Sequence, residues 1–223
     1  MVLYRIGDVG LKADYYHVLQ GGELILLPTA KEIWDSTINK VNVLIDGCKL
    51  KDILFESTTV QQCLVMLVTG LEVYTKNRFL EMEKEGKKPN IEALMNEFAI
   101  NNSLKNEVEN YSSSNKVSLL ESLVQVRKYG IINFQDWDTS KKAYNKGYNI
   151  RSGEIPKLKT ETLESIKKYI FWRHKIIHSK IDMSTLNSEE LPYKDPIFAT
   201  KGFIETARNN FIDFVEKLHL QTL

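Results

Sequence analysis

The segment from Phe171 to Lys180, FWRHKIIHSK, holds the residue types and the spacing that could carry out chemistry. Arg173 and His178 are separated by four residues, and His174 directly follows the arginine. A histidine titrates near neutral pH and can take the proton of a ribose 2′-hydroxyl. An arginine offers a planar fork of donors that matches phosphate oxygens. The pair could therefore support metal-free cleavage of an RNA phosphodiester.

Helix geometry limits how this pair can act. Residues five apart lie about 140° apart around an ideal helix, so one straight helix does not stack Arg173 over His178. A helix that ends or kinks at His178 would relax this limit, and so would a site assembled from two copies of the same helix.

Two other interpretations of the segment remain open. His174 and His178 are four residues apart, so both rings could grip one metal ion. Lys175, however, stands where a zinc protease needs glutamate, and a cation beside a metal is unfavourable; we therefore predict no metal and no cofactor. In the structural alternative, the cationic last turn complements the helix dipole while Ile176 and Ile177 pack inward.

A second candidate is Glu72, the only charged residue in the apolar stretch from Cys63 to Tyr74. A carboxylate in such surroundings should not be left unpaired. We expect Glu72 to orient Arg173 or His178. The alternative is that Glu72 lies at the helix surface or pairs with a structural lysine.

The near-neutral charge of the chain hides a strong asymmetry. The formal net charge is +1, yet residues 139–180 contain eleven basic and three acidic residues, a local charge of +8. The remaining residues therefore carry a charge of −7. Interleaved aromatic residues suit a phosphate backbone with stacked bases, although charge runs are usually solvated faces. The predicted RNA-binding residues are Lys146, Tyr148, Arg151, Lys168, Lys175 and Lys180.

Composition excludes several classes of protein. A chain of 223 residues can bury a core that needs no disulfide bond or metal ion to stabilise it. Two cysteines without a CxxC pattern exclude a disulfide scaffold and a zinc ribbon. The longest apolar run, Cys63–Val68, is too short to span a bilayer, and no signal peptide is visible. We expect a soluble, cytoplasmic protein that does not engage a membrane.

Hydrophobic periodicity predicts an all-α protein with a single domain. Thr29 and Glu32 form a capping box before the first helix, which closes at Gly47. Further helices are expected over 51–85, 91–99, 103–111, 117–129, 160–178 and 199–219. The charged run Glu81–Lys88 is expected to fray into solvent.

The regions between these helices carry predictions as well. Within residues 1–28, an N-terminal arm, Glu23–Leu27 is interpreted as a short strand or a buried extended piece. Ser112–Asn115, residues 130–160 and residues 181–196 are predicted to be loops, the second of them long and ordered.

Arg173-x4-His178, with a polar residue after the arginine and one more helix after the motif, resembles the Arg-x4–6-His motif of the HEPN superfamily. The upstream helix, with Gly70–Tyr74 (GLEVY), Lys76 and Phe79, is similar to the acidic-aromatic helix that often precedes that motif. The resemblance covers approximately residues 30–85 and 160–219. It makes residues 90–158 an insertion between core helices.

The resemblance implies an antiparallel four-helix bundle with extra helices, active as a homodimer with a composite site between subunits. It implies a toxin or phage-defence endoribonuclease that needs no metal and leaves a 2′,3′-cyclic phosphate and a 5′-OH. Arg173 and His178 would be the catalytic pair, and His174 would assist or orient. An antitoxin or regulatory partner is implied, although Lys180 replaces the tyrosine of the subgroup paired with nucleotidyltransferase antitoxins. The alternative is a non-catalytic helical module that binds RNA or protein through residues 139–180.

Overall fold

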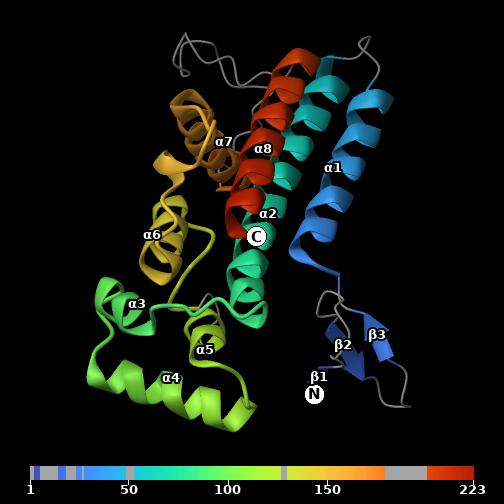
Figure 1. Ribbon diagram of the computed structural model, residues 1–223. Helices are drawn as coiled ribbons and strands as arrows, with labels where there is room; N and C mark the ends of the chain where they lie inside the picture. Colours follow the sequence, from blue (N-terminus) through green and yellow to red (C-terminus); the bar gives the residue numbers. More distant parts are fainter. Residues whose placement is uncertain are drawn as a thin grey trace.

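The computed structural model describes residues 3–5, 15–18, 24–26, 28–48, 53–126, 130–178 and 200–223. Helices dominate these residues (Figure 1). They are α1 (Ala30–Gly47), α2 (Ile53–Lys84), α3 (Ile91–Glu97), α4 (Asn102–Asn115), α5 (Leu119–Gln125), α6 (Trp137–Tyr148), the 3₁₀ turn η1 (Ser152–Glu154), α7 (Thr160–His178) and α8 (Lys201–Thr222). The predicted all-α class is confirmed for this helical body. None of the described helices is both long enough and apolar enough to cross a membrane.

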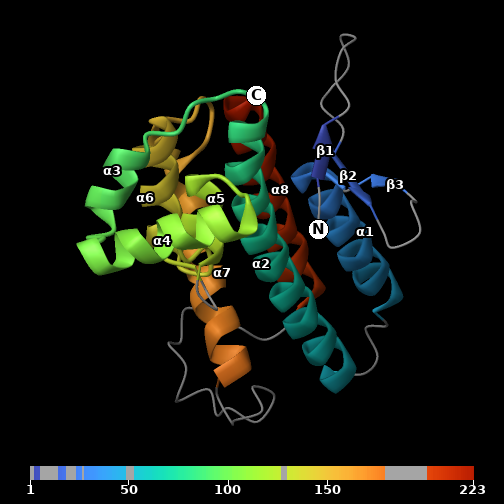
Figure 2. The same cartoon turned by 90° about the horizontal axis from the view of Figure 1, so that it is seen from below.

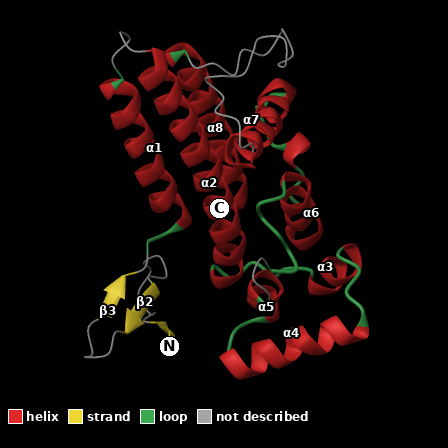
Figure 3. Cartoon of the chain, turned by 180° about the vertical axis from the view of Figure 1, so that it is seen from behind, coloured by secondary structure: helices red, strands yellow, loops and turns green. Residues whose placement is uncertain are grey.

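A small antiparallel sheet precedes the helices. It contains β1 (Leu3–Arg5), β2 (Tyr15–Val18) and β3 (Leu24–Leu26), paired in the order β1-β2-β3. Figure 3 shows the sheet beside the end of α1 at which that helix begins. Of the two alternatives for Glu23–Leu27, the short strand is the one observed, whereas the two preceding strands were not expected.

The start of α1 follows the predicted capping box. The backbone N–H of Glu32 donates to Thr29 Oγ1 at 3.2 Å, and the backbone N–H of Thr29 donates to Glu32 Oε2 at 2.7 Å. These bonds satisfy donors that an α-helix leaves unpaired at its N-terminus.

Helices α2 and α8 run side by side in the same direction (Figure 2). The backbone N–H of Lys201 donates to Glu56 Oε1 at 2.9 Å. Side-chain hydrogen bonds of 3.2 and 2.9 Å join Tyr74 to His219 and Arg78 to Thr222. Each partner lies 144 or 145 residues further along the chain, so the register is constant from one end of the pair to the other. Helix α2 also packs against α1 and α7, which makes it the central element.

Aromatic residues fill the space between α7 and α8. The Tyr169 ring packs against Phe203 and Phe211, and Trp172 packs against Phe203 with ring centroids 5.6 Å apart. Burial of such side chains contributes about 1.5–3 kcal/mol each. This packing fixes the rotation of α7 against α8. It therefore also fixes which way the residues next to Tyr169 and Trp172 face.

The prediction of a loop over residues 130–160 is wrong, because α6 occupies Trp137–Tyr148. Its Tyr144 hydroxyl donates to the Thr75 carbonyl at 2.8 Å, and its Tyr148 hydroxyl donates to the Phe79 carbonyl at 3.1 Å. Both the two tyrosines and the two carbonyls are four residues apart, so one face of α6 lies along α2.

One smaller prediction is wrong, because Ser112–Asn115 is not a loop but the last turn of α4. The expected fraying within Glu81–Lys88 is right in part: α2 ends at Lys84 and Glu85 is exposed, but Glu81 and Glu85 bind the buried guanidinium of Arg78. Among the described residues of 117–129, the helix spans Leu119–Gln125. The loop predicted over 181–196 lies outside the described residues.

Candidate functional site

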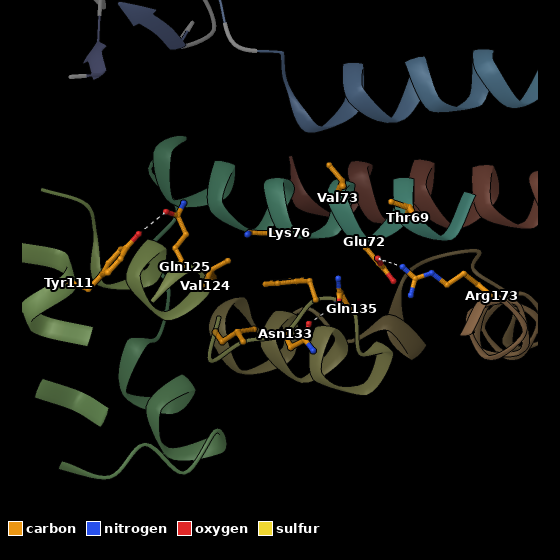
Figure 4. Close-up of a pocket in the computed structure, with 12 residues that line it drawn as sticks. Thr69, Glu72, Val73, Lys76, Tyr111, Val124, Gln125, Asn133, Gln135 and Arg173 are labelled. Atoms are coloured by element: carbon orange, nitrogen blue, oxygen red, sulfur yellow. Dashed lines mark hydrogen bonds and ion pairs between the residues drawn. The ribbon is translucent and has the colours of Figure 1, made fainter. Parts of the chain in front are cut away.

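Glu72 on α2 and Arg173 on α7 meet although they are 101 residues apart in the chain. The Nη2 atom of Arg173 donates to Glu72 Oε2 at 3.4 Å (Figure 4). The side chain of Glu72 is 11% exposed, and that of Arg173 is 17% exposed. Two of the residues predicted to act together from sequence are thus in contact.

Helix geometry explains why Arg173 reaches α2. Trp172 is buried against α8, and successive helical residues are rotated by about 100°. Arg173 is therefore turned from α8 toward α2, and His174, one step further, is exposed to solvent. The packing of the tryptophan selects which neighbour faces Glu72.

The contact leaves both partners incompletely bonded. Glu72 Oε1 and Arg173 Nε are buried and have no hydrogen-bond partner among the described residues. Burial raises the pKa of the Glu72 carboxyl above its usual value, and the positive charge of Arg173 offsets part of that rise. The site therefore holds an unused buried acceptor and an unused buried donor.

An open groove of about 510 Å³ borders this pair. Helix α2 forms one wall, α4, α5 and residues 132–135 form the other, and Arg173 closes one end (Figure 4). Its polar lining includes Thr69, Glu72, Lys76, Tyr111, Gln125, Asn133, Gln135 and Arg173. Such a space is of the size that binds small molecules in proteins.

The other predicted residues on α7 lie on or near its solvent side. His174, Lys168 and Lys175 are exposed, with the lysine Nζ atoms 5.8 and 5.3 Å from the ring centroids of Trp172 and Phe171. His178 is the last residue of α7, and its side chain is not among those the structure describes. Lys180 lies outside the described residues. The catalytic and metal-binding interpretations of His178 therefore both stay predictions.

The remaining predicted RNA-binding residues lie elsewhere, at the C-terminal end of α6. Lys146 pairs with Glu97 at 3.2 Å, and Arg151 pairs with Glu154 at 2.9 Å. Tyr148 is half-buried, with its ring edge-on to Phe79 at 5.2 Å. The structure thus divides the predicted RNA-binding set into two groups and gives Tyr148 a packing role in the core.

Sequence reasoning did not identify the wall of the groove opposite α2. This wall comes from three separate parts of the chain, namely Tyr111 on α4, Gln125 on α5, and Asn133 and Gln135 in the segment after α5. No common helical or strand spacing joins the three parts. Lys76 was noted only as part of the upstream helix. Its spacing of four from Glu72, which places both on one face of α2, was an available signal.

No protein-family model, curated protein or solved structure matches this chain. Among the described residues, no three His, Cys, Asp or Glu side chains gather closely enough to hold a metal ion.

Proposed function

We propose that the chain is a metal-independent endoribonuclease of the HEPN type in which Arg173 and His178 act on the RNA phosphodiester. The observation that carries the proposal is the buried contact between Arg173 and Glu72 at the end of an open groove. It holds a guanidinium in place while leaving its Nε donor unpaired among the described residues. Such preorganised donors are what a developing phosphorane charge needs.

The chemistry follows from the residue types. His178 takes the proton of the ribose 2′-hydroxyl, the 2′-oxygen attacks phosphorus, and the bond from phosphorus to the 5′-oxygen breaks. Arg173 stabilises the charge on the phosphorane oxygens. His174 assists or orients, and a protonated histidine of the second copy gives the leaving 5′-oxygen its proton. The products are a 2′,3′-cyclic phosphate and a 5′-hydroxyl.

Glu72 acts in this scheme as a positioning residue, because it contacts Arg173. The four long helices α1, α2, α7 and α8 would form the antiparallel bundle, with residues 90–158 as an insertion. The active species would be a homodimer that serves as a toxin or phage-defence effector under the control of an antitoxin or regulatory protein.

The test is an RNA-cleavage assay with and without EDTA, followed by analysis of the product ends. We expect cleavage to survive EDTA and to leave a cyclic phosphate. His178→Ala and Arg173→Ala should each lower kcat by about 10²–10³-fold. Lys40→Ala, an exposed lysine of α1, is the matched control and should leave kcat unchanged.

Glu72→Gln separates positioning from simple structural support. It should lower kcat by about tenfold with little change in KM, because a misplaced guanidinium is a loss of orientation. Glu72→Asp should restore part of the activity because it keeps the charge. Activity of His178→Ala at the wild-type level would contradict the proposal.

A second candidate function is RNA binding without cleavage. It is favoured by the exposed basic residues Lys167, Lys168 and Lys175, which α7 carries alongside Arg173. This function predicts salt-sensitive RNA binding that survives His178→Ala, with no product formed at any enzyme concentration.

A further inference from the structure

The groove has a direction. Figure 4 shows Arg173 and Glu72 at one end, Tyr111 and Gln125 at the other, and Lys76, Asn133 and Gln135 between them. Its volume of about 510 Å³ and its open form suit a ligand that enters from the surface and continues beyond the groove. A polymer lying along the groove would contact two cations, Arg173 and Lys76, with the Glu72 acceptor between them. It would then contact the aromatic ring of Tyr111.

One buried atom in the groove calls for a ligand. Glu72 is buried, and its Oε1 atom has no donor among the described residues. A buried acceptor without a partner costs about 1–3 kcal/mol. This oxygen repels a phosphate oxygen and attracts an N–H or O–H donor. The base edges and the ribose 2′-hydroxyls of RNA present such donors, whereas its phosphates at neutral pH do not.

The α2 wall continues this pattern. Thr69, Glu72, Val73 and Lys76 follow the spacing of one helical face. Val73 is 37% exposed and offers an apolar surface beside the acceptor. Lys76, one turn beyond Glu72, offers an ammonium that suits a phosphate. Glu72, Val73 and Lys76 thus offer an acceptor, an apolar surface and a cation. These suit the edge of a base, the flat face of that base and a neighbouring phosphate.

The opposite wall adds donors, acceptors and a ring. Asn133 Oδ1 accepts the backbone N–H of Gln135 at 3.0 Å, which fixes the amide, and no described residue accepts from its NH₂ group. The Gln135 side chain is exposed. At the far end the Tyr111 hydroxyl donates to Gln125 at 3.4 Å, and this bond orients the ring. Amides read base edges, and aromatic rings stack on bases.

We propose that this groove binds single-stranded RNA beside the scissile phosphate. Glu72 Oε1 and Asn133 form hydrogen bonds with the edge of one base. Lys76 binds a phosphate, and Tyr111 stacks on a further base. The strand must be unpaired, because a duplex hides these base edges in its base pairs and in a deep, narrow major groove. This inference rests on the proposed function for its substrate class, and it adds which part of the RNA is recognised and by which residues.

Binding is measured with a mixed-sequence oligonucleotide that is 2′-O-methylated at every position, so that it lacks the attacking hydroxyl. Its fluorescence anisotropy gives Kd at fixed salt for the wild type and for Lys76→Ala, Gln135→Ala and Tyr111→Leu. The matched controls are Lys40→Ala on α1 and Gln62→Ala on α2, both exposed and outside the groove lining. Thermal unfolding of each variant verifies the fold.

We expect Tyr111→Leu to raise Kd about tenfold. Lys76→Ala should raise Kd for all sequences and lower the salt slope by about one. Gln135→Ala should change which sequences bind best, the controls should match the wild type, and the annealed duplex should bind more weakly than the single strand. Wild-type Kd in all three groove variants, or equal affinity for the duplex, overturns the inference.

The cleavage assay keeps the two proposals apart. If wild-type protein cleaves RNA, and all three groove variants cleave at the wild-type rate and positions, the groove assignment fails while the nuclease stands. If wild-type protein does not cleave, but Tyr111→Leu and Lys76→Ala weaken binding as expected, the nuclease fails while the groove stands.

Discussion

Two arginines of this protein are bound by carboxylates in different ways: one is fully hydrogen-bonded, and the other is not. Arg78 is buried and binds Glu85 through two bonds of 2.6 and 2.8 Å, with Glu81 and Thr222 as further partners. Arg173 makes one contact of 3.4 Å with Glu72. A satisfied bidentate network rigidifies a core. A single long contact that leaves Nε and Oε1 unused holds a guanidinium that is available to a ligand.

The raised pKa of Glu72 gives this pair a signature in stability. The folded protein binds the Glu72 proton more tightly than the unfolded chain does, because burial opposes the charged form. The resulting stability is present below the ordinary pKa of 4.5 and is lost as the pH rises through the raised value. We expect Glu72→Gln to remove this fall in stability with rising pH. Arg173→Gln should move the fall to higher pH, since the positive charge of Arg173 lowers the pKa of Glu72. Urea unfolding from pH 4 to 8 measures both effects.

Glu97 is the control with the opposite sign. Hydrogen bonds from Lys146 and Lys142 lower its pKa, so its contribution is present above the ordinary value and is lost as the pH falls. Glu97→Gln should therefore remove a loss of stability at the acidic end only. An identical pH profile for wild type and Glu72→Gln would contradict the burial of the Glu72 carboxyl.

At the scale of elements, the close approach of α1 to α2 depends on a glycine. A Cβ atom added to Gly70 would lie 2.6 Å from Thr37 Cγ2, well inside contact distance. The hydroxyl of Thr37 donates to the Ile33 carbonyl at 3.0 Å, which restrains the threonine rotamer. The absence of a side chain at Gly70 thus lets α1 lie against the central helix two residues before Glu72.

We expect Gly70→Ala to lower the free energy of unfolding, because overpacking costs about 1–3 kcal/mol and the better helix propensity of alanine returns only about 1 kcal/mol. Thr37→Ala should rescue it, giving a measurable coupling in a double-mutant cycle. Gly202→Ala is the control, since its Cβ would meet only Thr200 Oγ1 at 4.0 Å. A Gly70→Ala protein as stable as the wild type would show that the helices can separate without cost.

The elements that sequence predicted best are those with strong local signals. Thr29 and Glu32 fix the start of α1 through their own spacing. The apolar stretch of α2 and the apolar face of α8 likewise leave little choice of structure. Helix α6 was missed although its buried residues, Trp137, Ser140, Ala143, Tyr144 and Gly147, follow helical spacing. Three of these five residues are small, and a glycine such as Gly147 is typical of a loop. Its best local signal was Asp136, whose side chain accepts the Thr139 N–H at 2.6 Å.

The residues of the candidate site were likewise predictable only where the local sequence carries a strong signal. Arg173 has a recognisable spacing to His178, and Glu72 stands out as a charge within an apolar helix, so each could be selected from local sequence. The opposite wall could not be selected. Asn133, Gln135 and Tyr111 are common polar types. Only the tertiary packing of α4 on α5 and of α5 on α2, together with the path of residues 132–135, brings them to the groove.

At the scale of the whole molecule, the proposed dimer needs an exposed apolar surface near His178. Phe171 on α7 is 57% exposed. His174 and His178 follow it by three and seven residues, so the backbone places all three on one face of α7. A second copy that covers Phe171 would bring the two His178 positions toward each other. Charge favours this face for RNA as well, since the exposed Lys167, Lys168 and Lys175 lie three or four residues from Phe171 on α7.

Phe171→Asp should therefore dissociate the dimer and lower cleavage together, without lowering the melting temperature. Burial of one phenylalanine contributes about 1.5–3 kcal/mol, so the dimer dissociation constant should rise about tenfold or more. Analytical ultracentrifugation over a concentration series measures it, beside cleavage at the same concentrations. Leu220→Asp on α8, at a side chain that is 71% exposed, is the matched control and should change neither quantity. A wild-type monomer that cleaves RNA at a rate per protein molecule independent of concentration would contradict the composite site, because that site requires His178 from both copies.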